Sequence, residues 1–123
     1  MYELKIQSEF SAAHNLRGYE GECEKLHGHN WKVEASLLAK DLDNIGIALD
    51  FKILKKETEK LIKNFDHKYL NEIPPFDKEN PSSENIARII FKKLSDVLNN
   101  ENIKISKITV WESEKAAATY YEE

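Results

Sequence analysis

The sequence is poor in the residues that build disulfides, membrane spans and flexible linkers. Its 123 residues include one cysteine, which excludes a disulfide within the chain. Only four glycines and three prolines are present, and no repeat or low-complexity tract interrupts the chain. No apolar run approaches the roughly 20 residues that cross a bilayer. These absences favour a single soluble domain that spans residues 1–123.

An excess of positive charge is also missing. Lys and Arg total 18 and Asp and Glu total 22, so the formal net charge is −4. Such a chain has no surplus of cations to neutralise phosphates, and we expect no nucleic-acid partner. We expect no membrane partner either. Residues 1–5 lack the apolar core of a signal peptide, so the cytoplasm is the expected location.

The hydrophobic pattern predicts an α+β domain. Four segments are typical of strands, three by polar–apolar alternation or β-branched content and one as a short last strand, and two carry the 3–4-residue apolar spacing of amphipathic helices. The predicted order is strand 2–10, strand 30–39, helix 51–65, helix 83–98, strand 103–112 and strand 116–121. Asp50 is the expected N-cap of the first helix, and Ser82 or Ser83 that of the second. A slip in alternation near residues 106–107 predicts a bulge.

A domain of this size buries roughly two-thirds of its unfolded surface and has a limited core. Its interior is too small to enclose a large ligand alone. A site between subunits would remove that limit.

Three of the four histidines lie in one segment, residues 14–29, with three of the four glycines and the only cysteine. His27 and His29 point to the same side if the chain is extended, and a hairpin would bring His14 beside them. Three imidazoles with an open fourth position describe a catalytic zinc site, although copper, nickel, cobalt or iron also suit these ligands. The alternative is that they are ordinary loop histidines.

Cys23 lies four residues before His27. A thiol near a cation has its thiolate stabilised and can act as a base or nucleophile. The alternative is a fourth zinc ligand, which would make the site closed and structural. Spacing alone leaves both interpretations open.

Carboxylates offer further candidates. Asp66 and His67 follow the first helix, and an imidazole held by a carboxylate can move protons near neutral pH, although a surface pair is the commoner arrangement. Glu112 lies in a hydrophobic strand, either at a solvent edge or in a pocket where it would accept paired N–H donors of a heterocycle. Glu84 suits the first turn of its helix, where an acid favours the helix dipole.

Together these residues resemble the 6-pyruvoyltetrahydropterin synthase family. The motif C-x-x-x-H-G-H stands at 23–29 and follows F-S-A-A-H at 10–14. The resemblance continues in order through G-I-A-L-D-F at 46–51, D-H-K-Y-L-N at 66–71, P-S-S-E-N at 81–85 and V-W-E-S at 110–113. Ser82 stands where the family commonly has threonine, and Ala48 is smaller than the usual residue. Within the family, the chain is most similar to the small 6-carboxy-5,6,7,8-tetrahydropterin synthases of the queuosine (7-deazaguanine) pathway.

The resemblance implies a tunnelling fold (T-fold) with the order β-β-α-α-β-β, in which two helices cover one face of an antiparallel sheet. Subunits would join their sheets into a barrel, as a homohexamer built from two trimers. The active sites would lie between subunits.

The resemblance also implies a set of site residues. Zn²⁺ would be held by His14, His27 and His29. Cys23 would be the catalytic thiol and not a ligand, and Asp66 and His67 would complete the proton-transfer set from a neighbouring subunit. The pterin ring would be anchored by Glu112, in a pocket lined by Ser82, Ser83 and Glu84.

The function implied is the zinc-dependent conversion of 7,8-dihydroneopterin 3′-triphosphate to 6-carboxy-5,6,7,8-tetrahydropterin, with release of acetaldehyde and triphosphate. The alternative within the family is elimination of triphosphate to give 6-pyruvoyltetrahydropterin. An alternative of another class is a non-catalytic zinc-binding oligomer. Weak candidates for contacting the triphosphate are Arg17, Lys25 and Lys115.

Overall fold

Two long strands form the centre of the molecule. In the computed structural model, which describes residues 1–19 and 25–123, β1 (Tyr2–His14) pairs antiparallel with β2 (His27–Ala39). The register runs without a break from Tyr2 opposite Ala39 to His14 opposite His27. Both strands are longer than predicted and reach into the segment expected to be a loop.

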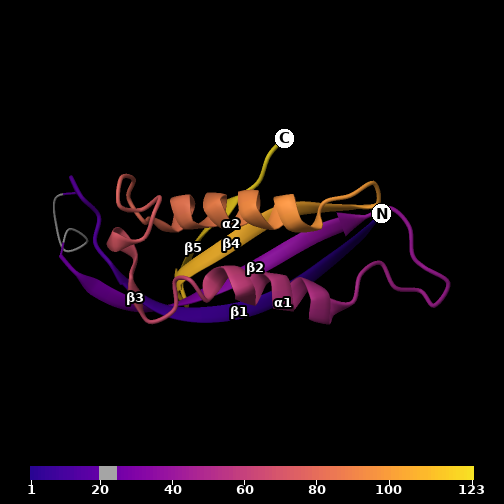
Figure 1. Ribbon diagram of the computed structural model, residues 1–123, viewed down its shortest axis with the longest axis horizontal. Helices are drawn as coiled ribbons and strands as arrows, with labels where there is room; N and C mark the ends of the chain where they lie inside the picture. Colours follow the sequence, from indigo (N-terminus) through magenta and orange to yellow (C-terminus); the bar gives the residue numbers. More distant parts are fainter. Residues whose placement is uncertain (20–24) are drawn as a thin grey trace.

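Two helices cover one face of the sheet (Figure 1). The remaining elements are α1 (Phe51–Ile62), β3 (Lys68–Tyr69), the 3₁₀ turn η2 (Leu70–Glu72), α2 (Ser83–Leu98), β4 (Ile103–Ser113) and β5 (Ala116–Tyr120). The strand order is β3-β1-β2-β4-β5, and every pairing is antiparallel except that of β3 with β1. The predicted α+β order is therefore confirmed, and the described residues add the two-residue β3 and the short turn η2.

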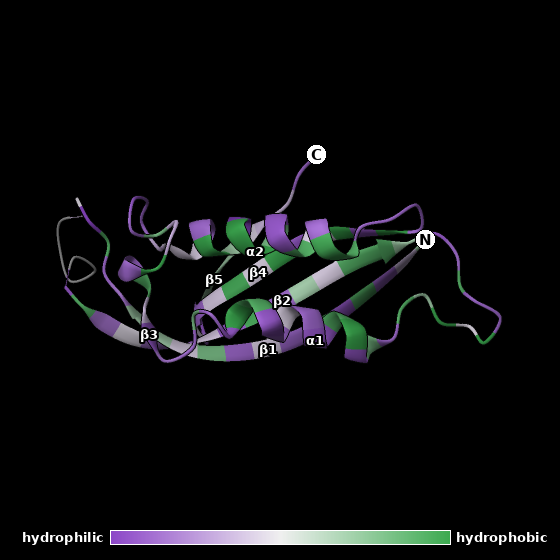
Figure 2. Ribbon diagram, in the orientation of Figure 1, coloured by the Kyte–Doolittle hydropathy of each residue, from purple (hydrophilic) through white to green (hydrophobic). Residues whose placement is uncertain are grey.

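The helix starts follow the predicted capping chemistry. The Asp50 carboxylate accepts from the backbone N–H of Lys52, and the Ser82 hydroxyl accepts from that of Asn85. Figure 2 shows hydrophobic and hydrophilic segments alternating along α2, as expected for a helix with one buried side. Phe51 and Val97 belong to the apolar spacing of the two helices, which predicts buried positions, but both are exposed. Neither described helix is long and apolar enough to cross a membrane.

The core lies between the helices and the inner face of the sheet. Trp31 and the alternate residues Val33, Ala35 and Leu37 are fully buried there. Trp31 stacks on Phe10 with ring centroids 5.9 Å apart, and its indole N–H donates to the Ala12 carbonyl. His29 precedes Trp31 by two residues on the same face, so the histidines begin where the hydrophobic core ends.

Two bulges interrupt β4. Ser36 pairs with Lys107 and Leu37 with Ile105, which leaves Ser106 as the extra residue and confirms the predicted irregularity. The second bulge lies against β5, where Trp111 pairs with Ala117 and Ser113 with Ala116. Glu112 is the residue that this second bulge leaves without a partner on β5.

Candidate functional site

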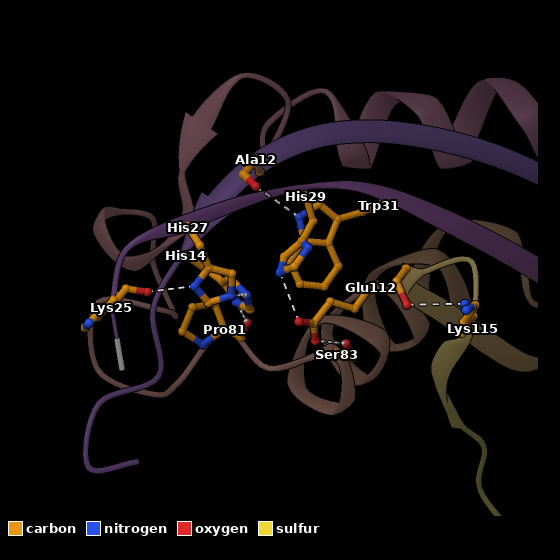
Figure 3. A network of polar contacts seen from close by, with 11 residues as sticks. Ala12, His14, Lys25, His27, His29, Trp31, Pro81, Ser83, Glu112 and Lys115 are labelled. Carbon is orange, nitrogen blue, oxygen red and sulfur yellow. Dashed lines mark hydrogen bonds and ion pairs between the residues drawn. The ribbon is translucent and has the colours of Figure 1, made fainter. Parts of the chain in front are cut away.

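The end of the β1–β2 hairpin at which β1 stops and β2 begins gathers three imidazoles (Figure 3). His14 lies opposite His27 in the ladder, and their ring centroids are 4.6 Å apart. The ring of His29 is 4.7 Å from that of His27 and 5.3 Å from that of His14. One nitrogen from each ring and one carboxylate oxygen of Glu112 all lie within 4.8 Å of one another. The hairpin interpretation of the sequence thus places the three side chains correctly.

Backbone carbonyls fix which ring nitrogens face the centre. Nδ1 of His14 donates to the Pro81 carbonyl at 2.7 Å, and Nδ1 of His27 donates to the Lys25 carbonyl at 2.6 Å. A carbonyl only accepts, so in the neutral rings each Nδ1 carries the proton and each Nε2 keeps its lone pair. These two Nε2 atoms face each other at 3.1 Å.

The third imidazole also directs an Nε2 atom to this centre. Nε2 of His29 is buried without a hydrogen-bond partner, although Glu112 Oε1 lies 2.9 Å away at ion-pair distance. Zn–N bonds of about 2.0–2.1 Å at a tetrahedral angle place two ligand nitrogens about 3.3 Å apart, close to the spacing of His14 and His27. Lone pairs that converge on one point are stabilised by a cation between them. The donor set therefore fits a divalent metal ion, and imidazole nitrogens suit Zn²⁺.

Burial also favours the ligand form of these rings. The pKa of His14 is lowered by desolvation, against a smaller opposing effect of the Pro81 carbonyl. Desolvation lowers the pKa of His29 as well, and the nearby Glu112 carboxylate opposes it. Both rings are consequently neutral near pH 7, which is the state that binds a metal.

Glu112 reaches this centre because of its place in β4. Its position follows the buried Val110 by two residues, so the side chain points to the inner face, toward His29. The Ser83 hydroxyl donates to Glu112 Oε2 at 3.5 Å. Beside the imidazoles, the carboxylate can complete a metal's coordination or accept paired N–H donors of a ring.

The segment around the α2 N-terminus divides into three different environments. Ser82 caps the helix, Ser83 is buried beside Glu112, and Glu84 is exposed in the first turn. Of these three, Ser83 is the residue that the described contacts connect to the imidazole centre. That the segment lines a ligand pocket stays a prediction.

Asp66 and His67 form a side-chain pair after α1. His67 Nδ1 lies 3.0 Å from Asp66 Oδ1, and the positive φ of His67 (58°) provides the turn that lets adjacent side chains meet. Asp66 accepts from the backbone N–H of Ser11, which is the main reason that its pKa is lowered, and the His67 N–H donates to the Ser11 carbonyl. The His67 side chain is 82% exposed.

A shallow groove connects this pair with the hairpin end. It is lined by His67 and His29 and by the small residues Ser11, Ala13 and Gly28. The pair therefore lies exposed beside β1, where a second molecule can reach it.

Comparison with known proteins accounts for this arrangement. Residues 3–123 match the family described as 6-pyruvoyl tetrahydropterin synthase. The chain belongs to this family. It is 38% identical over 101 residues to 6-carboxy-5,6,7,8-tetrahydropterin synthase of Synechocystis, covering 78% of this chain and 77% of that protein. It is 32% identical over 106 residues to dihydroneopterin monophosphate aldolase of Pyrococcus furiosus, covering 86% and 85%.

Solved structures agree on the fold. The structure of Caenorhabditis elegans 6-pyruvoyl tetrahydropterin synthase superimposes with a TM-score of 0.85 at 29% identity, covering 99% of this chain and 96% of that one. The 6-pyruvoyl tetrahydropterin synthase of Plasmodium vivax gives a TM-score of 0.81 at 23% identity, covering 98% and 97%. The T-fold that the sequence motifs indicated is thereby confirmed for the single chain.

Two of the residues that the sequence suggested for the site are not among those that the structure describes there. Cys23 is outside the described residues. Arg17, a candidate for the triphosphate, instead donates to the backbone carbonyls of Asn71, Phe76 and Glu79. These three bonds assign its guanidinium a role inside the fold.

Sequence reasoning missed the groups that orient the imidazoles. The acceptors are main-chain carbonyls of Pro81 and Lys25, and a carbonyl leaves no signal in residue type. In the sequence, Pro81 stands out only as the first residue of the P-S-S-E-N motif. Its position directly before the α2 cap is the one hint that its carbonyl is held rigidly.

Removing two of the imidazoles tests the metal centre. The double variant His27→Asn/His29→Asn should retain no Zn²⁺ after gel filtration, where the unaltered chain retains about one ion per chain. His67→Asn is the matched control, because this fourth histidine is exposed and paired with Asp66. Metal analysis by mass spectrometry is the measurement. Equal zinc contents in the double variant and the control would refute the centre.

The Asp66 carboxyl should titrate at a pKa below its ordinary value of 3.8. A lowered pKa means that this group stabilises the fold above that pH, and that the contribution is lost as the pH falls through the folded-state pKa. NMR titration of the side-chain carbonyl carbon measures it. In His67→Asn the pKa should rise only in part, because the Ser11 N–H remains. A pKa of 3.8 or higher in the unaltered protein would contradict this assignment.

Proposed function

We propose that this protein converts 7,8-dihydroneopterin 3′-triphosphate to 6-carboxy-5,6,7,8-tetrahydropterin, with release of acetaldehyde and triphosphate, in queuosine (7-deazaguanine) biosynthesis in the cytoplasm. The observation that carries the proposal is the set of three converging imidazoles, one buried and two half-buried, with the Glu112 carboxylate beside it. Support for the carboxy product comes from the relative at 38% identity that is named for it.

The overall reaction balances without an external redox cofactor. The substrate takes up one water and yields three products. The pterin ring gains two hydrogen atoms as it passes from the dihydro to the tetrahydro level. The side chain supplies these electrons, since its first carbon is oxidised to the carboxylate. Its second and third carbons leave as acetaldehyde, and the C–O bond to triphosphate breaks.

The metal would be held by His14, His27 and His29, and when bound it supplies a Lewis acid that stabilises negative charge developing on the side-chain oxygens. Glu112 accepts hydrogen bonds from the amide and amino N–H groups of the pterin, which orients the ring. Ser83 helps to hold that carboxylate in place.

Two groups would move protons. The Cys23 thiolate removes the proton from the side-chain carbon next to the ring. His67, held by Asp66, returns protons elsewhere on the substrate. In this assignment Ser82, Ser83 and Glu84 form the wall of the pterin pocket.

The proposal includes a homohexamer, built from two trimers, with active sites between subunits. Its support is the exposure of the proton-transfer pair: the His67 side chain is 82% exposed and borders an open groove. A catalytic imidazole needs a site from which water is excluded, and a neighbouring chain would supply the missing walls. One small domain then suffices because no single chain builds the site.

Product analysis distinguishes this function from its alternatives. With 7,8-dihydroneopterin 3′-triphosphate, mass spectrometry should detect 6-carboxytetrahydropterin and acetaldehyde. Accumulation of 6-pyruvoyltetrahydropterin without acetaldehyde would replace the carboxy assignment by triphosphate elimination. The monophosphate is offered in parallel, because the Pyrococcus relative is named for an activity on it.

The control for this assay is Cys23→Ala. It should keep its zinc and lose at least about 100-fold in kcat, because a positioned general base contributes roughly 10²–10⁴-fold. Loss of zinc together with activity would instead identify the thiol as a ligand. Absence of turnover in the unaltered, zinc-loaded protein with both pterin phosphates would favour a non-catalytic zinc-binding oligomer.

A further inference from the structure

The chain beyond β1 is held by two asparagine side chains. The backbone N–H of Asn15 donates to Asn71 Oδ1 at 3.0 Å, and Asn71 Nδ2 donates back to the Asn15 carbonyl at 2.9 Å. Asn80 repeats this contact two residues later: the Arg17 N–H donates to its Oδ1 at 2.9 Å, and its Nδ2 donates to the Arg17 carbonyl at 2.9 Å. We call these four residues the asparagine clamp.

The clamp reproduces what a neighbouring β-strand would do. In an antiparallel ladder, a partner bonds both the N–H and the C=O of every second residue. A carboxamide carries a donor and an acceptor and can satisfy both groups of one residue. Asn71 and Asn80 therefore satisfy the main-chain groups of Asn15 and Arg17 just past His14, where β1 ends.

The Arg17 side chain adds a second set of contacts to the same region. Its guanidinium donates to the carbonyl of Asn71 in η2 (3.2 Å) and to those of Phe76 (2.6 Å) and Glu79 (3.3 Å) in the connector between η2 and α2. Asn71 is itself buried, so its carboxamide has no water to replace a lost partner. Tyr69 adds a hydroxyl bond to Asn15 Oδ1.

The clamp ends next to the first imidazole. Asn80 directly precedes Pro81, whose carbonyl accepts from His14 Nδ1 at 2.7 Å. The Asn80 carbonyl accepts from Asn85 Nδ2 at 2.8 Å, and the Asn85 N–H is held by the Ser82 cap. The Pro81 carbonyl is thus fixed from one side by the clamp and from the other by the start of α2.

We propose that the asparagine clamp is a positioning device of the metal centre: Asn80, supported by Asn71, sets the Pro81 carbonyl that orients the His14 ring. The inference rests on the proposed metal site and adds residues that touch neither metal nor substrate. Outer-shell groups that hold a ligating histidine typically change metal affinity by 10–100-fold when altered.

A substitution of one atom tests the clamp. Asn80→Asp keeps the shape and the acceptor, but it replaces the donor by a carboxylate oxygen that faces the Arg17 carbonyl. Two acceptors then repel each other, and the connector that carries Pro81 must shift. Asn71→Asp makes the same change at Asn15, the residue that directly follows His14.

The chain contains a matched control at the other end of β2. Asn102 Nδ2 donates to the Asp41 carbonyl at 2.9 Å, and the Asp41 N–H donates to Asn102 Oδ1 at 2.8 Å. This is the same two-way contact. It lies two residues after Ala39, at the end of β2 far from His27. Asn102→Asp therefore makes the same change from donor to acceptor without touching Pro81.

The measurement is Zn²⁺ affinity by chelator competition, together with the visible absorption of the Co²⁺-loaded protein. Asn80→Asp should bind Zn²⁺ at least about 10-fold more weakly and show an altered Co²⁺ spectrum, with Asn71→Asp changed in the same direction. Asn102→Asp should stay within about twofold of the unaltered protein, even if both variants lose similar thermal stability.

Equal Zn²⁺ affinities for Asn80→Asp and Asn102→Asp would overturn the inference and leave the metal site intact. An unaltered protein that binds no Zn²⁺ would overturn the proposed function and the inference with it. If circular dichroism shows that Asn80→Asp does not fold, Asn80→Ala and Asn102→Ala give the same comparison without an added charge.

Discussion

Thirteen consecutive residue pairs join β1 to β2, and the last of them sets His14 opposite His27. Side chains on a strand alternate between faces, so a slip of one residue would move His14 away from the face that carries His27 and His29. The same slip would also break the contact between Phe10 and the fully buried Trp31. The packing of the core therefore fixes the register, and the register assembles the imidazoles.

The imidazoles lie where the core ends, and this position gives them their chemistry. They are covered enough for desolvation to lower the pKa of His14 and His29. The Nε2 atoms of His14 and His27 lie 3.1 Å apart, and the Nδ1 proton of each ring is donated to a backbone carbonyl. Glu112 lies two residues beyond the buried Val110 on the same face of β4 and reaches the same point. The pairing of the strands thus determines both the packing of the hydrophobic core and the geometry of the imidazoles.

Local sequence patterns predicted most of this fold. Period-two alternation found the strands, Asp50 and Ser82 marked the helix starts, and the slip near Ser106 showed the first bulge. The three histidines could be grouped because two lie at i and i+2 and the third ends the facing strand. These features depend on residue type and spacing, which a sequence displays directly.

What escaped prediction depends on long-range pairing. The ends of β1 and β2 were missed because Ala13 and Gly28 break the polar alternation, yet the ladder continues through them. β3 consists of two residues and exists only because β1 is beside it. The exposure of Phe51 and Val97 follows from where the helices sit on the sheet, which their own periodicity does not contain. Carboxamide contacts such as Asn80 with Arg17 join residues more than 60 positions apart.

The central claim is that three imidazoles, and no thiolate, hold a metal with one position open to substrate. X-ray absorption at the zinc edge of the loaded protein tests it directly. The account predicts nitrogen or oxygen scatterers alone in the first shell, near 2.0–2.1 Å, with the multiple-scattering pattern of about three imidazoles. A sulfur scatterer near 2.3 Å would contradict it, because Cys23 would then close the site as a fourth ligand.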